Sequence, residues 1–128
     1  MTATVEKELL ALNQKLLESI ATADWKTYEQ LCDPTLTAVE PEGRGHLIEG
    51  LAFHRYYFDL GAASTPRNTT MSSPHVRVMG DVAIVTYVRL VQSTSTGAGP
   101  TTSAYEETRV WQMQHGKWRH VHFHRSPC

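Results

Sequence analysis

The chain has 128 residues and a mass of 14.4 kDa, the usual size of a single domain. Its 12 basic and 13 acidic residues give a formal charge of -1 with the seven histidines neutral. This balance argues against nucleic acid or an anionic membrane as the main partner, because both usually require a clear basic excess.

No segment of the sequence predicts membrane insertion or secretion. The longest purely apolar runs have about four residues, whereas a membrane-spanning helix needs about 18 or more. Three charged residues, Glu6, Lys7 and Glu8, stand where a signal peptide would be apolar. The two cysteines, Cys32 and Cys128, lie far apart, which is typical of a reduced protein. We therefore expect one cytoplasmic domain over residues 1–128.

The first half of the chain predicts helices. Apolar residues recur at spacings of three and four in the first of them: Val5, Leu9, Leu12, Leu16 and Ile20. Asp24 is a suitable N-cap for a short second helix. That helix is expected to end at Asp33-Pro34, because proline disfavours the helical conformation in the residue before it. A third helix is expected from about residue 47 to residue 60, followed by a loop over residues 61–66.

From about Asn68 onward the sequence predicts extended strands. We expect them over residues 67–73, 75–79, 82–92, 103–114 and 118–125. Gly80-Asp81 and His115-Gly116 supply turns, and the polar segment 93–102 forms the tip of a long hairpin. Helices followed by antiparallel strands predict an α+β domain, in which helices cover one side of a curved sheet.

Three of the predicted strands each place an arginine among large apolar side chains. Alternate residues of a strand share a face. The three sets are Val85, Tyr87, Arg89 and Val91; Tyr105, Glu107, Arg109, Trp111 and Met113; and Val121, Phe123 and Arg125. Guanidinium groups are rarely buried unpaired, so three of them suggest a partly buried cationic site. Alternatively, each arginine pairs with a carboxylate such as Glu107 or Glu40, or reaches solvent at a sheet edge.

The opposite face of the central strand is also mostly apolar. Ile84, Thr86, Val88 and Leu90 form this set, whereas a sheet face in contact with water is usually polar. We expect a second subunit to cover this face. The alternative is a helix folded across the back of the sheet.

A series of longer motifs runs through the whole chain. In order, they are Cys32-Asp33-Pro34, Glu40-Pro41-Glu42, Phe53-His54-Arg55, Glu106-Glu107-Thr108-Arg109-Val110-Trp111, Gly116-Lys117-Trp118 and Val121-His122-Phe123-His124-Arg125-Ser126. In this order and spacing, the chain closely resembles the association (hub) domain of calcium/calmodulin-dependent protein kinase II, from its first helix to its last strand.

The resemblance implies a cone-shaped fold like that of nuclear transport factor 2, with a long N-terminal helix packed on a strongly curved antiparallel sheet. It also implies a homo-oligomer of two stacked rings, commonly with twelve or fourteen subunits, which gathers attached kinase domains. A pocket for small carboxylates or an acidic peptide side chain is expected at Arg89, Arg109 and Arg125, with His54 from the third helix. Strand alternation selects the same three arginines.

The sequence lacks the signature motifs of a kinase catalytic domain, namely a glycine-rich nucleotide loop, a catalytic loop and Asp-Phe-Gly. We therefore expect a non-catalytic hub without a cofactor. The alternative is a small dimeric enzyme of the same fold, of isomerase, dehydratase or cyclase type, with His54 as general base. Three cations without a clear catalytic carboxylate suit the binding of an anion better than the abstraction of a proton.

The remaining histidines and Cys32 allow two other kinds of site. His120, His122 and His124 are expected to alternate on one face of the last strand, roughly 6.5–7 Å apart. Zinc ligands must converge at about 2 Å, so we expect surface or interface histidines rather than a metal site. Cys32 lies at the end of a helix and not at a helix N-terminus, so we do not expect it to be a nucleophile.

Overall fold

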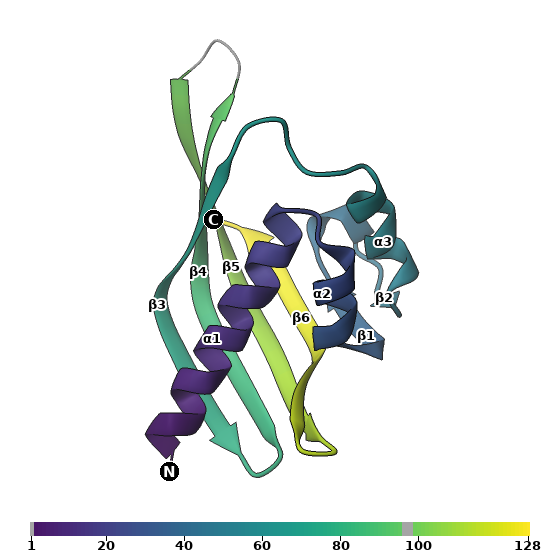
Figure 1. Ribbon diagram of the computed structural model, residues 1–128, viewed down its shortest axis with the longest axis vertical. Coiled ribbons are helices and arrows are strands. Elements are labelled where there is room, and N and C mark those ends of the chain that lie inside the picture. The colour runs from purple at the N-terminus through teal and green to yellow at the C-terminus, as the bar shows by residue number, and fades with distance from the viewer. Residues whose placement is uncertain (1, 96–98) are drawn as a thin grey trace.

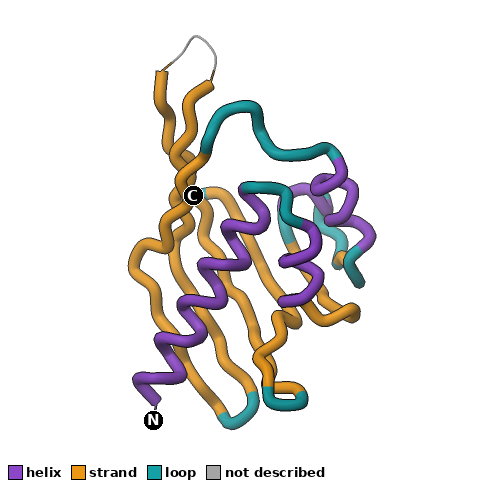
Figure 2. Tube along the Cα trace, viewed as in Figure 1, coloured by secondary structure: helices purple, strands orange, loops and turns teal. Residues whose placement is uncertain are grey.

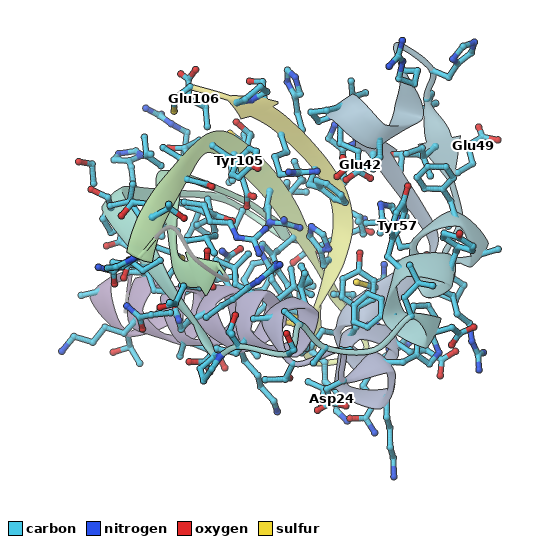
Figure 3. All side chains as sticks on the ribbon, turned by 90° about the horizontal axis from the view of Figure 1, so that it is seen from above. Asp24, Glu42, Glu49, Tyr57, Tyr105 and Glu106 are labelled. Atoms are coloured by element: carbon cyan, nitrogen blue, oxygen red, sulfur yellow. The ribbon has the colours of Figure 1, made fainter. Side chains whose placement is uncertain are left out.

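The computed structural model describes residues 2–95 and 99–128. Helices α1 (Thr2–Ala21), α2 (Trp25–Leu31) and α3 (Ala52–Asp59) lie on one side of a six-stranded sheet (Figure 1). Seen from above, strands β5 (Gly99–Gln114) and β6 (Lys117–Pro127) arch over the helical layer (Figure 3). The predicted α+β class is therefore confirmed, with helices on one side of a curved sheet.

Helix α1 packs its apolar stripe onto strands β3 (Arg67–Met79) and β4 (Val82–Ser95). Its Leu9, Leu16 and Leu17 side chains are completely buried. Burying a leucine side chain contributes about 1.5–3 kcal/mol, so this stripe holds the helix on the sheet. Asn13, which is also buried, accepts a hydrogen bond from Trp111 Nε1 at 3.1 Å and so fixes the helix against β5.

Helix α2 begins as predicted and ends earlier than predicted. The Asp24 carboxylate accepts hydrogen bonds from the Thr27 backbone nitrogen at 3.2 Å and from the Thr27 hydroxyl at 2.7 Å. The helix ends before Asp33, and strand β1 (Cys32–Val39) follows it directly. The sequence pattern does not indicate this strand, because Pro34 interrupts its apolar alternation.

The predicted helix over residues 47–60 is wrong in its first part. Strand β2 (Ile48–Glu49) precedes a turn at Gly50, whose φ of 81° suits glycine, and only then does α3 begin. Strand β2 pairs antiparallel with β1, and β1 pairs parallel with β6. The sheet order is β2-β1-β6-β5-β4-β3. The sheet is therefore mixed and not antiparallel throughout, since the long chain segment between β1 and β6 allows a parallel pair.

Strands β3 to β6 form a long meander with the predicted turns at Gly80-Asp81 and His115-Gly116. Strand β3 is one strand and not two, although its pairing with β4 shifts between Ser72 and His75. The predicted hairpin tip over residues 93–102 is extended at both ends. Residues 96–98 of that tip lie outside the described residues.

A β-bulge in β6 reverses the expected alternation near the end of the chain. Trp111 pairs with His120 and Val110 pairs with His122, so Val121 is an extra residue without a partner. His120 consequently faces the core and is completely buried. His122 and His124 remain on the opposite face. The predicted common face for the three histidines is wrong for this reason.

The opposite face of the sheet carries no helix in the described part of the chain (Figure 2). We call it the outer sheet face. Its apolar side chains are half-buried: Ile84, Val88, Leu90 and Val110. The alternative of a helix folded across the back is therefore wrong. No helix among the described residues is both long and apolar enough to span a membrane.

Candidate functional site

A cavity of about 520 Å³ opens between the helices and the inner face of the sheet. All four residues predicted from the sequence line it: His54, Arg89, Arg109 and Arg125. They come from α3, β4, β5 and β6 respectively. Figure 3 looks into this open end, where Tyr105, Glu42 and Tyr57, which also line the cavity, lie around the interior. We call this cavity the arginine pocket.

Strand register explains why the three arginines meet. Arg109 pairs with Val85 on one side and with Phe123 on the other, so all three side chains share the inner face. Glu107 pairs with Arg125 in the next row of the same face. Because β4 and β5 pair without a bulge, alternation along them is regular, and it places Arg89 on the inner face as well.

Arg109 is the most deeply buried of the three, with an exposed fraction of 1%. Its Nη2 donates to Glu107 Oε1 at 3.0 Å, and its Nε donates to the Tyr87 hydroxyl at 2.9 Å. Its guanidinium carbon lies 4.3 Å from the centre of the Phe123 ring. Burial lowers the pKa of Arg109, but the negative charge of Glu107 outweighs burial and raises it. The arginine is therefore charged and fully engaged at the floor of the pocket.

Glu107 joins two of the arginines. Besides Arg109, it accepts a hydrogen bond from Arg89 Nη1 at 3.3 Å and one from the Tyr87 hydroxyl. Burial raises the pKa of this carboxyl, but the charges of Arg109 and Arg89 outweigh burial and lower it. Glu107 therefore remains ionised although only 3% of it is exposed.

Arg125 is held by a second acidic group. Its Nη2 donates to Glu40 at 3.3 Å and also to Glu42. Glu40 accepts a further hydrogen bond from His54 Nε2. Burial raises the pKa of Glu40, but the hydrogen bond from His54, with the charge of Arg125, lowers it. The sequence left open that each arginine pairs with a carboxylate. This is correct for all three, since each one pairs with Glu107 or Glu40 while it lines the pocket.

Two pocket residues keep unused hydrogen-bonding capacity. Arg89 Nε and His54 Nδ1 are buried without a partner among the described residues. Arg89 makes one long hydrogen bond, whereas Arg109 uses every nitrogen of its guanidinium.

Sequence reasoning missed Arg67, which lines the mouth of the pocket from the start of β3. Only its register opposite Ser93 reveals that position.

The two other kinds of site that the sequence allowed do not assemble among the described residues. The histidine triplet is divided between two faces by the bulge at Val121. Cys32 is completely buried, and its Sγ lies 3.4 Å from His120 Nδ1. Burial raises the pKa of the Cys32 thiol to about 12, so the thiolate that a nucleophile requires does not form near neutral pH.

Comparison with known proteins agrees with these observations. Residues 5–128 match the family described as calcium/calmodulin dependent protein kinase II association domain. Over 124 residues the chain is 44% identical to the delta subunit of calcium/calmodulin-dependent protein kinase type II from Oryctolagus cuniculus. That match covers 94% of this chain but only 23% of the relative, so the chain spans less than a quarter of the kinase subunit's length.

Solved structures give the same result. The hub homology domain from Chlamydomonas reinhardtii has 48% identity and a TM-score of 0.91, with 97% of this chain and 98% of that chain covered. The association domain from C. elegans has 41% identity and a TM-score of 0.92, with 97% and 96% covered. A nuclear transport factor 2-like protein from Salmonella enterica shares the fold at 24% identity, with a TM-score of 0.80 and 99% and 93% covered.

The cone of helices and curved sheet is therefore a nuclear transport factor 2-like fold. The matched family is the non-catalytic association domain, so the chain is not an enzyme on its own. On the family match, the sequence identity and the shared structure together, this chain belongs to the calcium/calmodulin-dependent protein kinase II association domain family.

Proposed function

We propose that this chain is an oligomerisation hub that forms two stacked rings of twelve or more copies, and that its arginine pocket binds a small carboxylate or an acidic side chain. The hub structures that it resembles support self-association. The single observation that carries the assembly is the outer sheet face, whose apolar residues no described helix covers.

A second apolar surface lies on a different part of the molecule. Helix α3 exposes Phe53, Tyr56, Tyr57 and Leu60, with exposed fractions of 37% to 68%. One self-complementary surface produces a dimer, whereas two distinct surfaces allow a larger closed assembly. The outer sheet face and the exposed face of α3 together therefore favour a ring over a simple dimer.

The pocket proposal rests on charge and on unused donors. Four arginines line the pocket: Arg67, Arg89, Arg109 and Arg125. They face three carboxylates, Glu40, Glu42 and Glu107. One positive charge is therefore left over, and Arg89 is the buried arginine with free donor capacity. A guanidinium binds a carboxylate through two parallel hydrogen bonds, so a small carboxylate can compensate the remaining positive charge of the pocket.

His54 serves this pocket as a hydrogen-bonding group and not as a general base. Its Nε2 is engaged by Glu40, and the family to which the chain belongs is non-catalytic. Because Nε2 donates to Glu40, Nδ1 of the neutral ring is an acceptor, and it can accept a hydrogen bond from a hydroxyl group of a ligand but not bind its carboxylate. Both cysteines are free, which supports a cytoplasmic setting for the assembly.

Calorimetric titration with butyrate and phenylacetate tests the pocket. We expect binding to the unaltered protein, and at least tenfold weaker binding to Arg89→Gln, because a charge-assisted hydrogen bond contributes about 1.5–3 kcal/mol. Arg55→Gln is the matched control, since Arg55 is exposed on α3 outside the pocket and should leave the affinity unchanged. Equal affinity in Arg89→Gln and the unaltered protein would remove the pocket from the proposal.

A further inference from the structure

Three histidines lie on the outer sheet face, among the apolar residues that self-association would cover. His124 pairs with Thr108, and Thr108 pairs with Thr86, which is itself opposite His75. These side chains form one row across β6, β5, β4 and β3. The row is polar, and its two end residues are titratable.

The third histidine lies in the neighbouring row. His122 pairs with Val110, and Val110 pairs with Ile84, so His122 adjoins the apolar part of the face. It is half-buried and makes a hydrogen bond of 2.7 Å with the Thr37 hydroxyl through Nδ1. Burial lowers the pKa of His122, and the nearby His124 lowers it further. The geometry therefore opposes a positive charge at this position even before a second copy arrives.

The other charged groups on this face do not offset the histidines. They are Arg77 on β3, Glu106 on β5, Lys117 and Arg119 on β6, Glu49 on β2, and Asp33 on β1, which accepts a hydrogen bond from Gln114 of this face. Three bases and three acids give a formal charge of 0 with the histidines neutral, and +3 with all three protonated. In a two-fold contact the same groups face one another from both copies, so this charge is doubled within one interface.

We infer that His75, His122 and His124 make self-association pH-sensitive, so that the assembly is stable at neutral pH and loosens when these histidines take up protons. The inference rests on the proposed function, which assigns the outer sheet face to contact between copies. Association desolvates these rings and brings like charges together, and both effects favour the neutral form.

The expected size of the effect follows from proton linkage. A histidine of ordinary pKa, about 6.5, that has to stay neutral in the assembly weakens association about tenfold at pH 5.5. Each further group of this kind multiplies the loss, and His122 contributes less than tenfold because its pKa is already lowered before association. Association is therefore at full strength above the ordinary histidine pKa and is lost as the pH falls below it.

Light scattering coupled to gel filtration, at pH 7.5, 6.5 and 5.5 and at constant ionic strength, tests this. We expect the particle mass of the unaltered protein to fall at pH 5.5. The triple variant His75→Gln, His122→Gln and His124→Gln should keep its mass at pH 5.5. His46→Gln, at an exposed position away from this face, should behave like the unaltered protein. If the triple variant does not fold, His124→Gln and His75→Gln singly should each retain part of the assembly.

The outcomes separate this inference from the proposed function. A large particle at both pH 7.5 and pH 5.5 overturns the inference and leaves the hub intact. A monomer or dimer at pH 7.5 overturns the hub itself. If the particle mass of the triple variant falls at pH 5.5 as much as that of the unaltered protein, the inference is contradicted. It is also contradicted if the protein no longer unfolds cooperatively at pH 5.5. We expect the fold to persist there, because keeping the buried His120 ring neutral weakens folding only about tenfold at pH 5.5.

Discussion

Glu107 is the residue on which the floor of the pocket depends. It is the carboxylate that compensates both Arg89 and Arg109 inside the protein. Removing one partner of a buried ion pair is far more costly than losing an exposed pair, because it leaves an uncompensated charge in a poorly solvated site.

We therefore expect Glu107→Gln to lower the free energy of unfolding by about 3–5 kcal/mol. Urea unfolding at fixed protein concentration measures the change. Glu29→Gln, an exposed glutamate on α2, is the control and should change stability by less than about 0.5 kcal/mol. A change of similar size in the free energy of unfolding of both variants would contradict the stabilising role of Glu107.

His120 gives a prediction for pH dependence. Burial, together with the charge of Arg109, holds its pKa well below the ordinary value, so the folded protein keeps this ring neutral. The unfolded chain binds a proton near pH 6.5, so stability is fully present above that pH and falls as the pH drops below it.

The loss is about 1.4 kcal/mol per pH unit for one such group. His120→Leu removes the group, and we expect the stability of that variant to depend less steeply on pH between 6.5 and 5. Unfolding midpoints at a series of pH values measure the slope. His46→Leu is the control, and an unchanged slope in His120→Leu would contradict this account.

At the scale of the elements, the bulge in β6 decides which side chains reach the core. His120 and Phe123 are three positions apart and both face inward, which a regular strand does not allow, because residues an odd number apart lie on its opposite faces. Deleting Val121 leaves them two positions apart, so regular alternation then keeps His120, Phe123 and Arg125 on the inner face.

We therefore expect the deletion variant to keep cooperative thermal unfolding and carboxylate binding, because Phe123 and Arg125 stay on the inner face. Val121→Ala keeps the backbone length and removes only a half-buried side chain, so it should cost no more than about 1–2 kcal/mol. Circular dichroism during heating checks both variants. A deletion variant that unfolds without cooperativity would contradict this account.

The same elements show what sequence reasoning can reach. The inward direction of Arg89 and Arg109 was predictable, because β4 and β5 pair in unbroken register and alternation holds along them. The burial of His120 was not, since a bulge leaves no local signature in the sequence. Strand β1 was also missed, because its backbone is set by parallel pairing with a strand near the far end of the chain. Contacts such as Glu42 with Arg125 depend on that pairing.

The whole molecule has more apolar surface than a single copy can bury. The outer sheet face lies on the side of the sheet away from the helices, and α3, which carries the exposed aromatic residues, belongs to the helical layer on the other side (Figure 1). These two surfaces are the physical basis of the hub proposal. If both are covered by other copies, the particle mass exceeds that of a dimer.

Light scattering coupled to gel filtration at pH 7.5 is the most direct test of that statement. The account predicts a single particle with at least twelve times the 14.4 kDa mass of one chain. A particle with the mass of one chain or two would contradict it.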